Sequence, residues 1–249
     1  MIAFLKTIIY VPLYNGLMLL LDVLPIADIG IAVIILTFLV KIILYPLAKK
    51  TSVTQLQMKE RQPELDQIKE KHKNDKQAQA LQIMEFYKKY KINPFTSFFT
   101  ILIQIPVIFS LYYIFMSSGL PVVNNELLYS FITPPESISM NFLGFLDVSG
   151  KSLFFALLAG ITSFFQMKIT TPAVSQKTGG GMGDDLSRMM SLQMKYFMPV
   201  LIFFISWRIS AVVALYWAAS NLLGLAQDLY IKRKLAKSSS LQLPQPKNT

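Results

Sequence analysis

The chain has 249 residues, of which 53% are hydrophobic and only 15% are charged, and its formal net charge is +10. Soluble domains average roughly 25% charged residues, so this composition excludes a disordered chain and disfavours an ordinary soluble enzyme. There is no cysteine and one histidine, His72, which excludes disulfides, thiolate metal sites, a cysteine nucleophile and a histidine relay. We therefore expect an all-α polytopic membrane protein that is not an enzyme and needs no cofactor or metal.

The first segment is apolar but interrupted. Lys6, Asn15, Asp22 and two prolines fall within residues 1–25. We expect residues 1–28 to form an amphipathic helix at the extracytoplasmic interface. A cleaved signal peptide and a sixth span are the open alternatives; no small-residue cleavage site is evident, and a further span would disturb the charge distribution described below.

Three separate apolar stretches are long enough to cross a membrane, which takes about 20 residues of helix. The first covers residues 29–48 within a predicted segment 29–50, and Lys41 is its only charge before residue 49. The second covers residues 95–119 and has no charge, and the third covers residues 152–171.

The last apolar stretch is too long for a single span. Residues 196–227 are apolar apart from Arg208, and one helix of this length would measure about 48 Å against a hydrocarbon core of about 30 Å. We expect a tight turn at 207–210 between a fourth span at 189–206 and a fifth at 210–231. The total is then five transmembrane helices.

Positive charge is concentrated on one side of this arrangement. Residues 49–91 carry 11 Lys or Arg, residues 168–195 carry four, and the tail after Tyr230 carries five with no acid. The other aqueous segments carry three Lys or Arg against five acids. The positive-inside rule places the N-terminus outside and the C-terminus in the cytoplasm, and five spans satisfy this parity.

The aqueous segments have different characters. Residues 51–91 combine charged faces with apolar residues at three-to-four spacing and a turn at 72–75, which predicts a cytoplasmic helical hairpin. Residues 92–235 hold spans two to five and their loops. The glycine-rich run 178–183 lacks the Lys-Ser/Thr of a phosphate-binding loop and is expected to be a flexible loop. Residues 236–249 are expected to form a disordered basic tail.

Lys41 is a charge inside the first span. An ionised lysine near the middle of a membrane helix costs about 2.5–3.5 kcal/mol on insertion scales. Its side chain either snorkels to the cytoplasmic surface or lines a water-filled cavity. Snorkelling works against the tilt of side chains toward the N-terminus of their helix, which is the outer end here. The cavity is therefore the favoured interpretation, and snorkelling stays open.

Polar side chains recur at three-to-four spacing on the first, second, third and fifth spans. Each row alone is compatible with routine hydrogen bonding between helices. Four rows together with one cation, and no acid deep enough to pair with it, predict a hydrated groove open to the cytoplasm. The groove cation is Lys41, and the groove-lining candidates are Thr37, Gln104, Ser163, Gln166, Trp217, Ser220 and Asn221.

The sequence resembles the YidC family of membrane protein insertases, relatives of the mitochondrial Oxa and chloroplast Albino proteins. The matching segments occur in order at 36–47, 62–65, 90–95, 102–106, 160–168, 197–199 and 215–222. The resemblance covers roughly residues 1–235 and implies a short form without a large extracytoplasmic domain. The turn at 207–210 departs from the usual Pro-Ser-Gly-like turn of the family.

The resemblance implies a multi-pass protein of the bacterial plasma (inner) membrane, with a five-helix core whose hydrophilic groove is open to the cytoplasm and to lipid. Lys41 matches the groove cation, which is usually arginine in the family, and Gln166 and Trp217 match groove-lining positions. Lysine keeps the charge but loses the planar fork of arginine. The implied partners are nascent membrane proteins, the lipid bilayer, the ribosome through the basic tail and cytoplasmic loops, and the Sec translocon with its targeting factors.

These features predict an insertase and chaperone that brings nascent membrane proteins into the bilayer and helps them fold. The alternative is a small-molecule or anion transporter or channel that uses Lys41 as its substrate site. An intramembrane hydrolase is excluded because no span holds a paired aspartate, a histidine or a cysteine.

Overall fold

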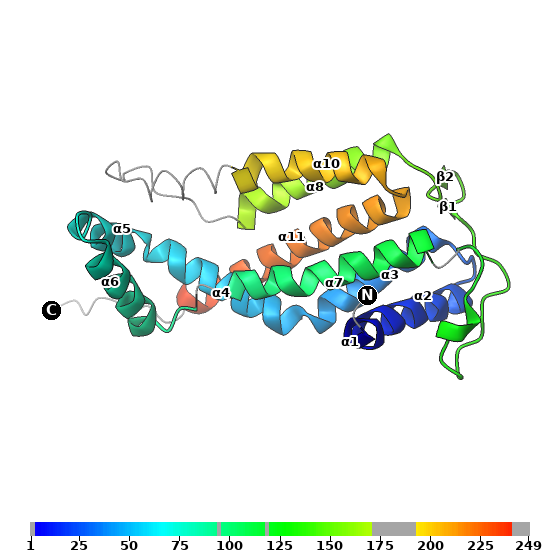
Figure 1. Ribbon diagram of the computed structural model, residues 1–249, viewed down its shortest axis with the longest axis horizontal. Helices are drawn as coiled ribbons and strands as arrows, with labels where there is room; N and C mark the ends of the chain where they lie inside the picture. Colours follow the sequence, from blue (N-terminus) through cyan, green and yellow to red (C-terminus); the bar gives the residue numbers. More distant parts are fainter. Residues whose placement is uncertain (1–2, 94–95, 118–119, 171–192, 241–249) are drawn as a thin grey trace.

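The computed structural model describes residues 3–93, 96–117, 120–170 and 193–240, and these are mostly helical (Figure 1). Two short strands pair antiparallel, with Asn141 opposite Asp147 and Phe142 opposite Leu146. The elements in chain order are α1 (Ala3–Leu5), η1 (Lys6–Tyr10), α2 (Val11–Val23), α3 (Ile29–Ile43), α4 (Tyr45–Glu60), α5 (Gln62–Lys71), α6 (Lys76–Lys89), α7 (Thr96–Ser117), η2 (Asn125–Leu127), β1 (Asn141–Phe142), β2 (Leu146–Asp147), α8 (Leu153–Thr170), η3 (Gln193–Phe197), α10 (Met198–Arg208) and α11 (Ala211–Ser240).

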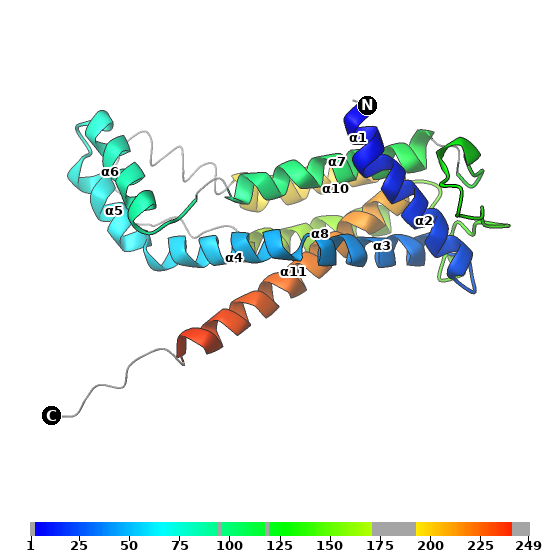
Figure 2. The ribbon, with the colours of Figure 1, turned by 90° about the horizontal axis from the view of Figure 1, so that it is seen from below.

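The long helices run lengthwise through one bundle. The α5–α6 pair lies at one end of the molecule, and the strands lie with the connecting loops at the other (Figures 1 and 2). Helix α11 is central: it packs most extensively against α8 and also against α3, while α10 packs mainly against α8 and also contacts α11. Within the described residues, α3 and α8 each pack extensively against α11, which lies between them in the bundle's contacts.

Helix α2 supplies much of the apolar core at the loop end. Tyr14, Leu17 and Met18 have no exposed surface, and α2 packs against α3. The helix ends before Pro25, as expected because the residue preceding a proline disfavours the helical conformation. The side chain of Asn15 donates to Leu127 O (2.7 Å) and accepts from the Tyr129 backbone N–H (2.7 Å), which fixes the loop after α7 onto α2.

Asp28 determines where α3 begins. Its buried carboxylate accepts from the backbone N–H groups of Gly30 (2.8 Å) and Ile31 (3.1 Å), which are donors that a helix start otherwise leaves without partners. The second oxygen accepts from Leu143 N (2.7 Å), so the strand turn is bound to the same helix start. Gly30 permits this approach, because an added Cβ would lie only 2.8 Å from Cγ of Phe142.

The first expected span is not one straight helix. Helix α3 ends at Ile43, α4 begins at Tyr45, and the two are bent by 64°. Pro46 explains the break, because it has no N–H to bond the carbonyl of Ile42 and its ring clashes with that carbonyl. Helix α4 then continues to Glu60 without a break at residue 50, where the span was expected to give way to the hairpin.

The last two helices are separated where the sequence predicts a turn. Helix α10 ends at Arg208 and α11 begins at Ala211. The Ser210 hydroxyl donates to Val148 O (3.0 Å), and the Ala211 N–H donates to Gly150 O (2.7 Å). The turn is therefore held by the chain that follows β2. Helix α11 extends to Ser240, so residues 236–240 of the expected tail are helical.

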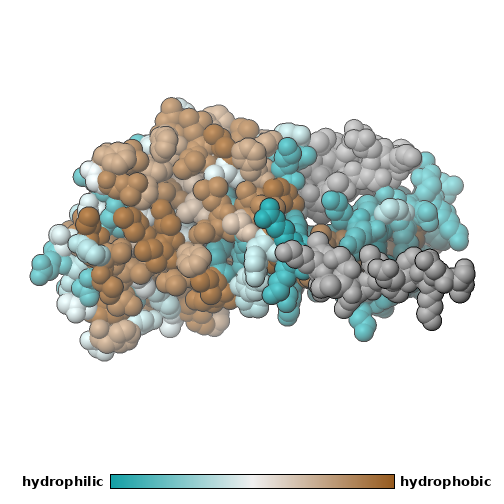
Figure 3. Space-filling model, turned by 180° about the vertical axis from the view of Figure 1, so that it is seen from behind, coloured by the Kyte–Doolittle hydropathy of each residue, from teal (hydrophilic) through white to brown (hydrophobic). Residues whose placement is uncertain are grey.

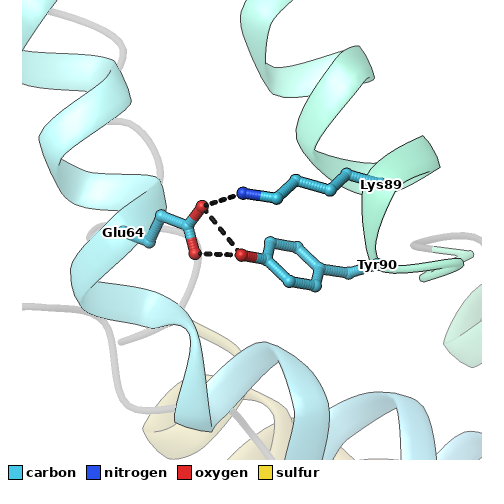
Figure 4. A network of polar contacts seen from close by, with 3 residues as sticks. All are labelled: Glu64, Lys89 and Tyr90. Atoms are coloured by element: carbon cyan, nitrogen blue, oxygen red, sulfur yellow. Dashed lines mark hydrogen bonds and ion pairs between the residues drawn. The ribbon is translucent and has the colours of Figure 1, made fainter.

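Helices α5 and α6 are joined by residues 72–75 and pack through Leu65 and Phe86. Figure 4 shows the polar contact beside this cluster: the Glu64 carboxylate accepts from Tyr90 OH (2.9 and 2.7 Å) and from Lys89 Nζ (3.1 Å). The hydrogen bond from Tyr90, and then that from Lys89, holds the pKa of Glu64 below its ordinary value. The guanidinium of Arg61 lies 3.7 Å from the centroid of the Tyr90 ring.

The face of the bundle that Figure 3 shows is largely apolar, whereas the described residues at the α5–α6 end are hydrophilic. Such a contiguous apolar exterior is typical of a surface in contact with lipid. Exposed members on the long helices include Phe38, Ile42, Ile43, Phe109, Phe154, Ile161, Phe165, Val200, Phe204 and Leu222.

By length and composition, two helical segments of the described chain suffice to cross a membrane, Lys6–Val23 and Leu153–Thr170. The bent pair α3 and α4 makes a third if it counts as one span, and Leu102–Met116 is apolar but shorter. The count of five spans and the interfacial position of residues 1–28 thus stay predictions. The glycine-rich run 178–183, and the part of the expected tail after Ser240, lie outside the described residues.

Candidate functional site

Lys41 lies in the last turn of α3, and its half-buried side chain extends to α11. A Cβ added to Gly224 of α11 would lie 3.5 Å from Lys41 Nζ and 2.7 Å from Gln166 Nε2 of α8. The ammonium, the amide and the bare backbone of a glycine thus meet where α3, α11 and α8 come together. Sequence reasoning predicted Lys41 and Gln166 but missed Gly224, whose signal was a lone glycine inside a helical pattern.

The backbone of the same turn is also tied to α11. Gln227 Nε2 donates to the carbonyl of Lys41 at 3.3 Å, which ties the end of α3 to α11. Among the described residues, no carboxylate oxygen lies within 4.0 Å of Lys41 Nζ. The ammonium therefore has no direct ion-pair partner within the described part of the bundle.

Asp228 is the acidic residue that acts on Lys41 from nearby. It interacts electrostatically with the ammonium, and it follows Gly224 by one helical turn, about 6 Å along the axis. Its carboxylate accepts a hydrogen bond of 2.5 Å from the hydroxyl of Ser52 on α4. Sequence reasoning expected no acid to be deep enough to pair with Lys41, and its groove-lining candidates included neither Asp228 nor Ser52.

A second polar contact joins α8 and α11 one turn further toward the loop end. Asn221 Nδ2 donates to Ser163 Oγ at 2.6 Å and lies 3.3 Å from Thr162 Oγ1 and 3.4 Å from Ala159 O. All of these groups lie in the packed interface between the two helices. Ser163 and Asn221 were predicted, and the structure brings them into direct contact.

A third contact joins α7 and α11. Gln104 Nε2 donates to the hydroxyl of Tyr216, and that hydroxyl also has a side-chain hydrogen bond with Ser220. Gln104 is half-buried, whereas Tyr216 and Ser220 are buried. Sequence reasoning predicted Gln104 and Ser220 but missed Tyr216, which belongs to the same face of α11 four residues before Ser220.

Two predicted residues make other contacts. The hydroxyl of Thr37 is buried and donates to Val33 O of its own helix at 2.6 Å. Trp217 is half-buried and packs against the apolar cluster of Ala159, Ile202 and Ala218 between α8, α10 and α11. Both therefore lie beside the contacts described above without a cross-helix hydrogen bond in the described part of the chain.

We call the set of contacts along α11 the polar seam. It begins with the pair Gln104 and Tyr216, continues through Asn221, and reaches the ammonium at Gly224 and the carboxylate of Asp228. Cross-helix hydrogen bonds satisfy the side chains of Gln104, Asn221 and Asp228 inside this apolar bundle. The described residues contain no group of three or more His, Cys, Asp or Glu that could hold a metal ion. Its members are Lys41, Ser52, Gln104, Ser163, Gln166, Tyr216, Ser220, Asn221, Gly224 and Asp228.

Comparisons with known proteins point in the same direction. A family model described as 60Kd inner membrane protein matches residues 22–238. The "Membrane protein insertase YidC" of Clostridium tetani is 31% identical over 212 residues, which cover 85% of this chain and 84% of that protein. The protein of the same name from Fusobacterium nucleatum is 31% identical over 209 residues, 84% of this chain and 88% of its own length. That of Nitratidesulfovibrio vulgaris is 33% identical over 208 residues, 82% of this chain but 35% of its own length.

Proposed function

The chain belongs to the 60Kd inner membrane protein family, which is the YidC and Oxa family, and on this premise we propose that it is a membrane protein insertase. Its relatives and its apolar helices identify it as a multi-pass inner membrane protein. Its clients are then nascent membrane proteins, which it inserts into the bilayer and helps to fold.

The observation that carries this proposal is the placement of Lys41. An ammonium is costly to place within a membrane bundle, yet here it lies next to an uncharged amide and a glycine, with no carboxylate of the described residues within 4.0 Å. A cation held this way is available to an external anion. In an insertase, that anion is an acidic residue in the short outgoing tail of a client.

The proposed mechanism uses a hydrophilic groove along the polar seam, open to the cytoplasm and to lipid. Moving unpaired polar groups through about 30 Å of hydrocarbon costs several kcal/mol for each group. A groove that reaches partway into the membrane shortens the dry path. Lys41 attracts the client tail more strongly there than in bulk water, because the local dielectric constant is lower. Burial of the client helix in lipid then drives release.

The proposed topology follows from the charge distribution: five transmembrane helices, the N-terminus outside and the C-terminus in the cytoplasm. Residues 1–28 form the extracytoplasmic interfacial helix in this arrangement, and residues 51–91 form the cytoplasmic helical hairpin. In this topology, α4 begins within the first span and continues as one helix to Glu60, so the span passes into the hairpin segment without a loop at residue 50. The α5–α6 pair and the basic C-terminal segment are the proposed surfaces for the ribosome and for the Sec translocon with its targeting factors.

Photocrosslinking during synthesis tests the proposal. A photoreactive amino acid at Gln166 should crosslink to a stalled single-span client, whereas the same probe at Ile161, an exposed position on the same helix, should crosslink to that client far less. Equal yields at the two positions would contradict a client path along the seam. A transporter would instead show saturable flux of a small anion that is lost in Lys41→Ala.

Charge substitutions test the role of the ammonium. Lys41→Arg should preserve insertion of a client with an acidic tail, whereas Lys41→Glu should reduce it strongly, because the groove then repels the tail. A client with an uncharged tail is the matched control. Equal insertion of the acidic client by the wild type and Lys41→Glu would count against the mechanism.

A further inference from the structure

Asp228 lies on the cytoplasmic side of Lys41 along the proposed path of the client tail. In the proposed topology, α11 runs from the extracytoplasmic side toward the cytoplasm, so Asp228 lies one turn closer to the cytoplasm than Gly224. Lys41 Nζ lies beside Gly224. A client tail that enters from the cytoplasm therefore passes the carboxylate of Asp228 before it reaches the ammonium.

The carboxylate is also held away from the ammonium. Ser52 is 1% exposed, and its hydroxyl donates to Asp228 Oδ1 across the contact between α4 and α11. This hydrogen bond satisfies one oxygen of Asp228 on the α4 side. The two opposite charges interact electrostatically but form no ion pair within 4.0 Å in the described part of the chain.

We propose that Asp228 is a built-in counter-charge that competes with client carboxylates for Lys41 and that Ser52 positions it to leave the ammonium available. Asp228 thereby determines how acidic a client tail must be for efficient insertion. A neutral tail gains little from Lys41, whereas a tail with two aspartates overcomes the competing charge. This inference rests on the proposed insertase function and assigns the selectivity of that same site.

Three consequences distinguish this role from a structural one. Asp228→Asn keeps the shape and the Ser52 contact but removes the charge, so it should favour acidic tails further. Ser52→Ala releases the carboxylate toward Lys41, so it should disfavour them. A Lys41→Gln background should abolish the effect of Asp228→Asn on tail preference, because the competing charge then has no cation to act on.

The test uses the full-length protein in proteoliposomes and two single-span clients whose N-terminal tails carry either no aspartate or two. Insertion is measured as protease protection of the tail, and the ratio of the two clients is taken from the same sample, which cancels differences in protein amount. For a partly exposed charge pair, Asp228→Asn should raise the ratio of acidic to neutral client by about two- to fivefold. Ser52→Ala should lower this ratio.

The outcomes separate the inference from the proposed function. If Asp228→Asn changes both clients alike, or if its effect on the ratio persists in Lys41→Gln, the counter-charge role is refuted while the insertase function stands. If Lys41→Gln leaves the ratio of the wild type unchanged, the role of Lys41 in tail recognition fails and the inference fails with it. A related insertase that inserts a reference client in the same proteoliposomes is the positive control. If the wild-type protein inserts no client under these conditions, the proposed function itself is refuted.

Discussion

Gly224 is the position where a small change should separate stability from function. In Gly224→Ala, the new Cβ would lie 2.7 Å from Gln166 Nε2 and 3.5 Å from Lys41 Nζ. The close atom is the far end of a flexible side chain, so it can move. Replacing glycine by alanine within a helix stabilises it by about 0.5–1 kcal/mol, which offsets the cost of displacing the amide. We expect Gly224→Ala to be as stable as the wild type.

Gly224→Leu should behave differently. Its branched side chain fills the space between the ammonium and the amide and pushes Lys41 Nζ away from α11. A hydrogen bond to a charged group contributes about 1.5–3 kcal/mol. If Lys41 can no longer form this bond with a carboxylate of the client, insertion of an acidic client should fall about tenfold or more. The assay is protease protection of the client tail in proteoliposomes, beside thermal unfolding of each variant in detergent.

A matched control is available on the same helix. Ala226 is exposed, so Ala226→Leu adds similar bulk to α11 without entering the seam. It should leave both insertion and thermal stability near those of the wild type. If Gly224→Leu inserts the acidic client as well as Ala226→Leu does, the space beside Gly224 has no role in client binding, and the reasoning is refuted.

Three further predictions concern stability. Asp28→Ala removes the cap of α3 and leaves the Leu143 N–H without its partner, so the free energy of unfolding in mixed micelles should fall by about 2–4 kcal/mol; an unchanged value would contradict the capping role. Gly160→Leu should cost about 1–3 kcal/mol by overpacking, seen as a lower unfolding temperature, because even a Cβ there lies 3.0 Å from Cβ of Phe203 on α10. Because the folded-state pKa of Glu64 is depressed below 4.5, its contribution to the α5–α6 contact is complete above that pH and is lost as the pH falls through the depressed pKa. Hydrogen exchange of α6 should show this loss in the wild type, and Glu64→Gln should remove the pH dependence.

The parts of the fold that could be predicted from sequence depend on local chemistry. Arg208 in the middle of a long apolar stretch predicted a turn, and the chain breaks at Ile209 and Ser210. The bend between α3 and α4 was missed although Pro46 carries its signal, because hydropathy alone reads residues 29–48 as continuous. The cap by Asp28 was missed although an aspartate directly before an apolar helix is its local signal, whereas the bond from Leu143, 115 residues away, leaves no local signal.

The site shows the same division. Ser163 and Gln166 lie on one face of α8, and Asn221 belongs to the polar face of α11, so helical periodicity could predict each face separately. The structure brings the two faces together at the interface of α8 and α11. Ser52 could not be found in this way, since it lies in a segment that was read as an aqueous hairpin. Its partner is 176 residues away, and only the path of α4 beside α11 brings the two together.

The break at Leu44 also bears on how the bundle tolerates a cation at Lys41. Because α3 ends at Ile43, Lys41 belongs to a helix C-terminus, where the macrodipole is negative and backbone carbonyls lack helical partners. A cation in the last turn of a helix is stabilised by about 0.3–1 kcal/mol, and by up to about 2 kcal/mol where it is partly buried. This stabilisation offsets part of the insertion cost of a lysine. Pro46, which ends α3 near Lys41, therefore lowers the cost of the charge without adding a carboxylate that would neutralise it. A helix end stabilises the ammonium without occupying it, as the proposed binding of a client carboxylate requires, whereas an ion pair at the same position would occupy it.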